Sequence, residues 1–65
     1  QKSLQFRRSL YVVEDMKAGD VFTEKNLRRI RPGMGLSPKY YDIILGKKAN
    51  CNITRGTAVQ WDLIE

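Results

Sequence analysis

A short motif occurs twice in the chain and constrains the fold more than any other feature. Residues 16–22 (MKAGDVF) and 53–59 (ITRGTAV) share the pattern apolar-x-x-Gly-x-x-apolar at an offset of 37 residues. Mostly polar residues and then a leucine follow each copy, and the second copy reaches Leu63 one residue sooner than the first reaches Leu27. The pattern predicts two halves of short strands and turns related by a pseudo-two-fold axis. The alternative is two similar hairpin turns with no shared history.

The chain is short and has few residues that could form a disulfide, bind a metal ion or catalyse a reaction. A chain of 65 residues forms one small domain, which buries only about 60% of the surface that its unfolded form exposes. There is no histidine and only one cysteine, Cys51, which we expect to be a buried thiol. These counts exclude an internal disulfide, a Cys/His zinc site and histidine-based acid–base catalysis.

The first half of the sequence predicts strands joined by tight turns. Residues 9–13 (SLYVV) are rich in β-branched and aromatic types and predict a strand. Gly19 lies in a polar segment and is expected to adopt a positive φ. Thr23 is a candidate N-cap of a short helical turn, and residues 27–30 return to extended structure.

The second half predicts one helix. Ser37 is a candidate N-cap, followed by Pro38 at the first helical position. The helix is expected to run to about Leu45, to bury Ile44, and to be closed by Gly46. The remainder is predicted as a weak strand, a turn, a short strand and a terminal turn (residues 47–53, 54–57, 58–61 and 62–64).

The most informative segment for function is residues 28–35 (RRIRPGMG). Pro32 and Gly33 suit the second and third positions of a type II turn, and Gly35 is expected to loosen the link that follows. A guanidinium beside a stiff turn loses little entropy on binding an oxygen acceptor, so Arg31 is the candidate binding residue. The alternative is that Arg31 is a solvated turn residue.

The other conspicuous side chains have simpler interpretations. Arg28 and Arg29 are expected to be solvated charges at a helix end. Tyr40, Tyr41 and Trp61 are expected to belong to the core or to cover it half-buried. No group of residues forms a catalytic constellation, and no apolar run is long enough to cross a membrane.

Several motifs follow one another in a characteristic order: residues 7–10 (RRSL), 15–23 (DMKAGDVFT), 31–38 (RPGMGLSP), 45–49 (LGKKA) and 53–56 (ITRG). With this order and spacing, residues 7–65 resemble the antifreeze-like, or SAF, domain at the C-terminus of bacterial sialic-acid-type synthases. The details SLYVV, PKY and WDLI look most like pseudaminic acid synthases, with N-acetylneuraminate and legionaminate synthases as close rivals.

The resemblance implies a mainly β fold with short 3-10 and α turns, the β-clip antifreeze-like fold with internal pseudo-two-fold symmetry. We expect this SAF domain to span residues 8–65 and residues 1–7 to be the end of a linker. Because the chain begins at Gln1 and not at Met, we interpret it as a piece of a longer enzyme.

The resemblance also implies a function. The parent enzyme would be a cytoplasmic synthase whose (β/α)₈ barrel condenses phosphoenolpyruvate with an N-acylated amino sugar, using Mn or Mg held by the barrel. The domain would cover the barrel of the other subunit in a homodimer, and Arg31 would help bind the sugar's N-acyl group. Pro32 and Gly33 would shape that loop. The domain itself would contribute no catalytic residue and no metal ligand, and alone it would be inactive.

Three alternatives remain open from the sequence. The net charge of +5, from 12 Lys and Arg against 7 Asp and Glu, is compatible with a module that binds nucleic acid or another polyanion. The related fold of type III antifreeze proteins raises the possibility of ice binding, which the scattered charges disfavour. A SAF domain of an assembly chaperone or a dehydratase is disfavoured by the Arg-Pro-Gly segment followed by Ser-Pro.

Overall fold

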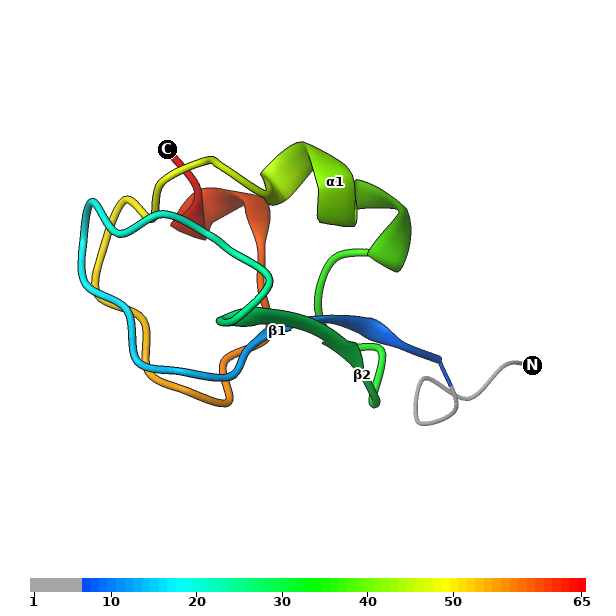
Figure 1. The fold of residues 1–65 in the computed structure, drawn as a ribbon. Coiled ribbons are helices and arrows are strands. Elements are labelled where there is room, and N and C mark those ends of the chain that lie inside the picture. Colours follow the sequence, from blue (N-terminus) through cyan, green and yellow to red (C-terminus); the bar gives the residue numbers. More distant parts are fainter. Residues whose placement is uncertain (1–6) are drawn as a thin grey trace.

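A two-stranded antiparallel hairpin forms the base of the molecule. The computed structural model describes residues 7–65, so the predicted linker, residues 1–7, lies outside the described part except for Arg7, which is exposed. Strand β1 (Ser9–Val12) pairs with β2 (Leu27–Ile30), with Ser9 opposite Ile30 and Val12 opposite Leu27 (Figure 1). Both strand predictions are confirmed, and β1 ends one residue sooner than expected. All four residues of β1 are buried, and backbone hydrogen bonds join the strand to β2 on one edge and to residues 56–59 on the other.

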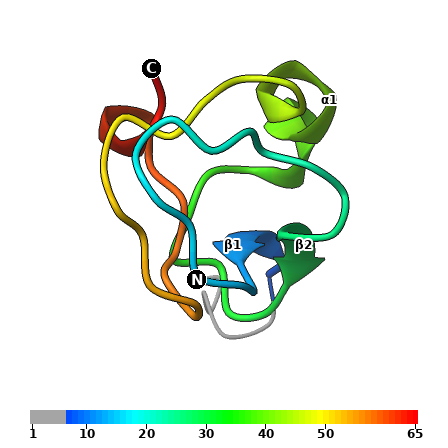
Figure 2. The same ribbon diagram turned by 60° about the vertical axis from the view of Figure 1, so that its left-hand side comes forward.

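The two halves of the chain are joined by reciprocal hydrogen bonds. Met16 and Ile53, the first residues of the two motif copies, each donate their N–H to the other's carbonyl at 2.8 Å. A two-fold axis therefore passes between these residues. In the ribbon, the cyan and the yellow-to-orange segments that carry the two copies run alongside each other (Figures 1 and 2).

The same symmetry relates bonds away from the axis. The N–H of Gly19 donates to Ala49 O at 2.8 Å, and the N–H of Gly56 donates to Val12 O at 2.7 Å. The two bonds are equivalent, because Gly19 corresponds to Gly56 and Val12 corresponds to Ala49 at the same offset of 37 residues. Both glycines have a positive φ, 93° and 91°, as predicted for Gly19. The predicted pseudo-two-fold arrangement is confirmed.

The residue of the second half that corresponds to Leu27 differs from the one predicted from the sequence. Val12 lies opposite Leu27 in the hairpin, and Ala49, which is equivalent to Val12, forms a bridge with Ile64. Leu27 is thus equivalent to Ile64, and the predicted pairing with Leu63 is wrong. The two halves match without a missing residue, because the backbone pairing and not the residue type sets the register.

The predicted helix is present in a tighter form. It consists of the 3-10 turn η2 (Pro38–Tyr40) followed by the single α turn α1 (Tyr41–Ile44). Ser37 caps it, accepting a hydrogen bond on Oγ from the N–H of Lys39 at 3.4 Å, and Gly46 ends it with a φ of 91°. Ile44 is fully buried, as predicted.

The two strands predicted after the helix are wrong as continuous strands. The segments pair only through isolated bridges, in which Lys48 faces Val21 while its neighbour Ala49 faces Ile64. Because consecutive residues pair with different segments, no ladder develops along them. Trp61 belongs to no strand and begins the 3-10 turn η3 (Trp61–Leu63).

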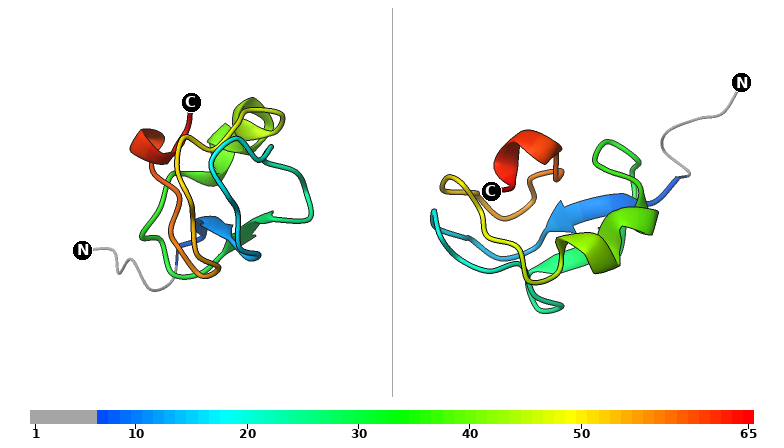
Figure 3. Two further views of the ribbon diagram at one scale, coloured as in Figure 1. Left: turned by 90° about the vertical axis from the view of Figure 1, so that its left-hand side faces the viewer. Right: turned by 90° about the horizontal axis from the view of Figure 1, so that it is seen from above.

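The core lies between the hairpin on one side and α1 with η3 on the other (Figure 3). Its fully buried side chains come from both halves, including Leu10, Val12, Leu27, Ile44 and Val59, with Phe22 the largest. Cys51 is half-buried against this core and carries a free thiol. None of the helices in residues 7–65 has the length and apolar character that crossing a membrane requires.

Candidate functional site

The candidate site is the segment that links the two halves, residues 31–37, which we call the Arg31 loop. It follows β2 directly and leads into η2. The peptide bond between Arg31 and Pro32 is cis. A type II turn needs a positive φ at its third position, and within residues 7–65 only Gly19, Gly46 and Gly56 have one. The predicted type II turn at Pro32 and Gly33 is therefore wrong, although the chain does bend there.

A buried hydroxyl group fixes both ends of this bend. Ser9 is 1% exposed, and its Oγ donates to Pro32 O at 2.9 Å while accepting the N–H of Gly35 at 3.0 Å. One side chain of β1 thus satisfies two backbone groups of the loop that lie three residues apart. Because the hydroxyl that makes both bonds is on a buried residue, the bonds hold the loop in one shape.

Gly35 provides a second anchor. A Cβ at this position would lie 2.6 Å from Leu10 O and 3.0 Å from both Val59 N and Val59 O. The next residue, Leu36, exchanges backbone hydrogen bonds with the same two segments, donating to Val59 O at 2.9 Å and accepting from Leu10 N at 3.0 Å. The expectation that Gly35 loosens the chain is wrong, since glycine permits the close approach that locks it.

The loop presents its outward side chains beside η3. Gln60 donates from Nε2 to Met34 O at 2.8 Å, and the Met34 side chain is 58% exposed. Trp61 is 47% exposed and meets Tyr40 edge-to-face, with ring centroids 5.1 Å apart. The prediction of half-buried cover is confirmed for Tyr40 and Tyr41, whereas for Trp61 it is wrong.

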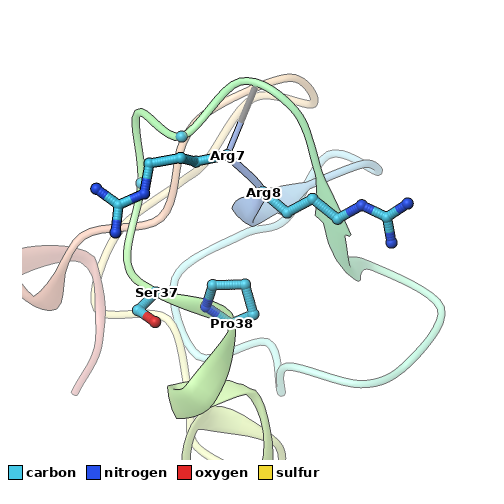
Figure 4. Close-up of a pocket in the computed structure, with 6 residues that line it drawn as sticks. Arg7, Arg8, Ser37 and Pro38 are labelled. Atoms are coloured by element: carbon cyan, nitrogen blue, oxygen red, sulfur yellow. The ribbon is translucent and has the colours of Figure 1, made fainter. Parts of the chain in front are cut away.

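Cationic side chains border the loop. Arg31 itself is exposed. A depression of about 120 Å³ is lined by Arg7, Arg8, Gly33, Gly35, Ser37 and Pro38. Ser37 and Pro38 lie on its far wall, and the guanidinium groups of Arg7 and Arg8 point to opposite sides (Figure 4). The loop can therefore offer hydrogen-bond donors to carboxylate, phosphate or amide oxygens from a basic surface.

The two arginines before the loop have structural partners. They lie in β2, so the prediction of a helix end is wrong. Arg28 donates from Nε to Glu24 O at 3.3 Å. The guanidinium of Arg29 lies 4.4 Å from the centre of the Tyr41 ring, which is a cation–π contact between β2 and α1. Of Arg28, Arg29 and Arg31, only Arg31 lies in the loop.

Other groups in the described chain serve the fold. A larger depression of about 280 Å³ lies on the two-fold axis, where Asp15 and Asn52 are equivalent residues of its wall. Their side chains accept the backbone N–H of Arg55 at 2.8 Å and of Ala18 at 2.9 Å, respectively. Within residues 7–65 no three His, Cys, Asp or Glu side chains are grouped so as to hold a metal ion.

Sequence reasoning missed three of the residues that shape this site. Ser9 could have been found, because a hydroxyl in an otherwise apolar strand has to have a partner if it is buried. Gly35 and Gln60 gave no such signal, since their roles depend on segments that are far away in the sequence.

The chain belongs to the SAF domain family, whose match covers residues 7–65. It is 46% identical over 59 residues to a pseudaminic acid synthase of Campylobacter jejuni, which covers 91% of this chain. Over all 65 residues it is 42% identical to a pseudaminic acid synthase of Helicobacter pylori. An N,N'-diacetyllegionaminic acid synthase of Legionella pneumophila is 32% identical over 59 residues.

A solved structure shares the fold. The spore coat polysaccharide biosynthesis protein spsE of Bacillus subtilis superposes with a TM-score of 0.84 over 94% of this chain, at 29% identity. These observations confirm the antifreeze-like fold and the resemblance stated from the motifs. The chain spans only 17% to 19% of the length of the relatives named above, and 18% of the solved chain.

Proposed function

We propose that the chain is the C-terminal lid of a nonulosonic acid synthase, an enzyme that condenses phosphoenolpyruvate with an N-acylated amino sugar. The lid would cover the barrel domain of the partner subunit, and Arg31 would donate hydrogen bonds to the oxygen of the sugar's N-acyl group. The similarity to pseudaminic and legionaminic acid synthases supports this class of reaction. The cytoplasm as the compartment remains a prediction.

The observation that carries the proposal is the pinned Arg31 loop. Its backbone is held by Ser9 and Gln60, so an arginine at its start is presented from a fixed base. A donor that is already positioned costs less entropy on binding than one on a mobile loop. A stiff loop is thus suited to recognising one acceptor on a substrate that another domain converts.

The role of the lid would be to bind and exclude water. The guanidinium of Arg31 carries N–H donors and no acceptor, so its role would be to bind an oxygen atom of the substrate. Closing a basic surface over the reactants would also favour anionic substrates such as phosphoenolpyruvate. The metal ion and the acid–base groups of the condensation would belong to the barrel.

We expect Arg31→Ala in the full synthase to raise the KM for the amino sugar and to lower kcat/KM about tenfold or more, because a charge-assisted hydrogen bond contributes about 1.5–3 kcal/mol. The KM for phosphoenolpyruvate should change much less. Steady-state kinetics with each substrate varied in turn would measure both effects. Arg28→Ala is the matched control, since it removes the same charge from an exposed residue of the neighbouring strand.

Equal sugar kinetics for Arg31→Ala and the unmodified enzyme would refute the role of Arg31. Circular dichroism of both variants would verify that the fold is retained. Lys in place of Arg31 should restore activity only in part, because an ammonium group does not reproduce the planar fork of a guanidinium.

A further inference from the structure

The pseudo-two-fold axis allows the side chains at equivalent surface positions of the two halves to be compared. Trp61 in η3 is equivalent to Glu24, which lies in the turn after Thr23. The two turns have the same backbone bond: the N–H of Asn26 donates to Thr23 O at 3.2 Å, and the N–H of Leu63 to Gln60 O at 3.0 Å. Glu24 is exposed, so this turn forms with a charged residue at the position. The backbone of this turn therefore does not require an aromatic side chain at the position of Trp61.

Trp61 belongs to an apolar surface that borders the Arg31 loop. We call it the Met34 face and define it by Met34, Tyr40 and Trp61. Met34 is 58% exposed and Trp61 is 47% exposed, and the rings of Tyr40 and Trp61 are in contact. The bond from Gln60 to Met34 O ties the loop to the residue that precedes η3, so Met34 is held next to the segment that carries Trp61. Exposed aromatic and methionine side chains that cluster in this way are typical of an interface core.

Polar groups of both signs surround the Met34 face. The ammonium group of Lys39 lies 5.3 Å from the centre of the Tyr40 ring, and Asp62 follows Trp61 in η3. Arg7 and Arg31 add positive charge on the side of the loop. An apolar centre with a mainly basic rim fits a partner that presents an apolar socket flanked by carboxylates.

We propose that the Met34 face docks onto the catalytic domain of the synthase, with Trp61 as the anchor that seats Arg31 over the sugar. The inference rests on the proposed function. The catalytic domain is the occupant favoured here because more than four-fifths of each related synthase lies outside the part that this chain matches. Met34 and Arg31 also share one pinned loop, so a surface that contacts Met34 is held next to the acceptor that Arg31 reaches.

The test uses the full synthase with Trp61→Glu and, as a second variant in case the first impairs folding, Met34→Glu. Glutamate is the residue that the equivalent turn already accommodates at Glu24. The matched control is Ile43→Glu, which places the same charge at a comparably exposed apolar residue (55%) of α1. We expect both face variants to lower kcat/KM for the amino sugar at least tenfold, and the control to stay within twofold.

A double-mutant cycle with Arg31→Ala provides the readout that a purely structural role would not change. If Trp61 acts by seating Arg31, then Trp61→Glu should cost at least tenfold in the presence of Arg31 and less than threefold in its absence. Equal losses in both backgrounds would overturn the inference.

The failures of the two proposals are distinguishable. If Arg31→Ala impairs sugar kinetics while both face variants behave like Ile43→Glu, the docking inference is wrong and the proposed function stands. If Arg31→Ala has no effect on sugar kinetics, the proposed function fails first. Dimerisation of the 65-residue chain in gel filtration that Trp61→Glu abolishes would assign the face to a second copy and would also overturn the inference.

Discussion

Two glycines of this chain are required for different physical reasons. Gly19 has a φ of 93° and open space around the missing side chain, so its requirement is conformational. Gly35 faces backbone atoms at 2.6 and 3.0 Å, so its requirement is steric. Backbone atoms cannot move aside as the end of a flexible side chain can, and this makes Gly35 the more demanding position.

We expect Gly35→Ala to lower the free energy of unfolding by about 3 kcal/mol, at the upper end of the range for overpacking, and Gly19→Ala by about 1–2 kcal/mol. Urea unfolding followed by the fluorescence of Trp61, the single tryptophan, would measure both. Asparagine distinguishes the two causes. It should be better tolerated than alanine at residue 19 and worse at residue 35, and the opposite order would contradict the assignment.

Ser9→Ala should lower the free energy of unfolding by about 1–3 kcal/mol, because Pro32 O and the N–H of Gly35 lose a shielded partner. Amide hydrogen exchange at Gly35 should accelerate in this variant. Ser37→Ala is the control, since it removes an exposed cap from a short helix and leaves the Gly35 amide bonded. Unchanged exchange at Gly35 in Ser9→Ala would show that the hydroxyl does not hold the loop.

At the scale of elements, side chains that are equivalent by the two-fold axis should be exchangeable. Asp15 and Asn52 accept equivalent backbone N–H groups through the same side-chain oxygen, Oδ1. We therefore expect Asp15→Asn to change the free energy of unfolding by less than about 0.5 kcal/mol, and Asp15→Ala to lower it by about 1 kcal/mol. A loss from Asp15→Asn as large as that from Asp15→Ala would mean that the charge of Asp15 matters, which the symmetry does not indicate.

Local patterns predicted the elements that depend on neighbours in the sequence. The strands β1 and β2, the cap at Ser37 and the helix end at Gly46 all follow from adjacent residues. The segments after Gly46 could not be predicted in the same way. Their apolar residues pair one at a time with distant segments, and an alternating pattern does not reveal where a ladder stops.

In the candidate site, too, the features that depend on adjacent residues were predicted and those that depend on distant segments were not. Arg31 was identified from the bend that Pro32 and Gly33 introduce and from the family resemblance, although the type of turn was wrong. The anchors of the loop, Ser9 and Gln60, lie more than 20 residues away from it in the sequence. Their contribution became visible only once the fold brought them together.

At the scale of the whole molecule, the net charge of +5 predicts weak binding to polyanions without sequence preference. We expect the 65-residue chain to bind random DNA only at low salt, because the binding would arise from counterion release alone. The complex should have dissociated by the time the salt concentration reaches about 0.2 M. Fluorescence anisotropy at increasing NaCl concentration would measure this. Binding that persists at 0.2 M salt would favour the nucleic-acid alternative that the charge left open.

The reciprocal bonds between Met16 and Ile53 have a consequence for how such a domain acquires new properties. Residues 9–28 and 46–65 are copies of one structural unit, so a change that benefits one copy has to remain compatible with the pairing of the other. Residues 29–45 have no counterpart and are free of that restriction. The Arg31 loop lies in this unpaired connection, so its exposed side chains, Arg31 and Met34, can vary to suit a different partner without changing the pairing of the two copies.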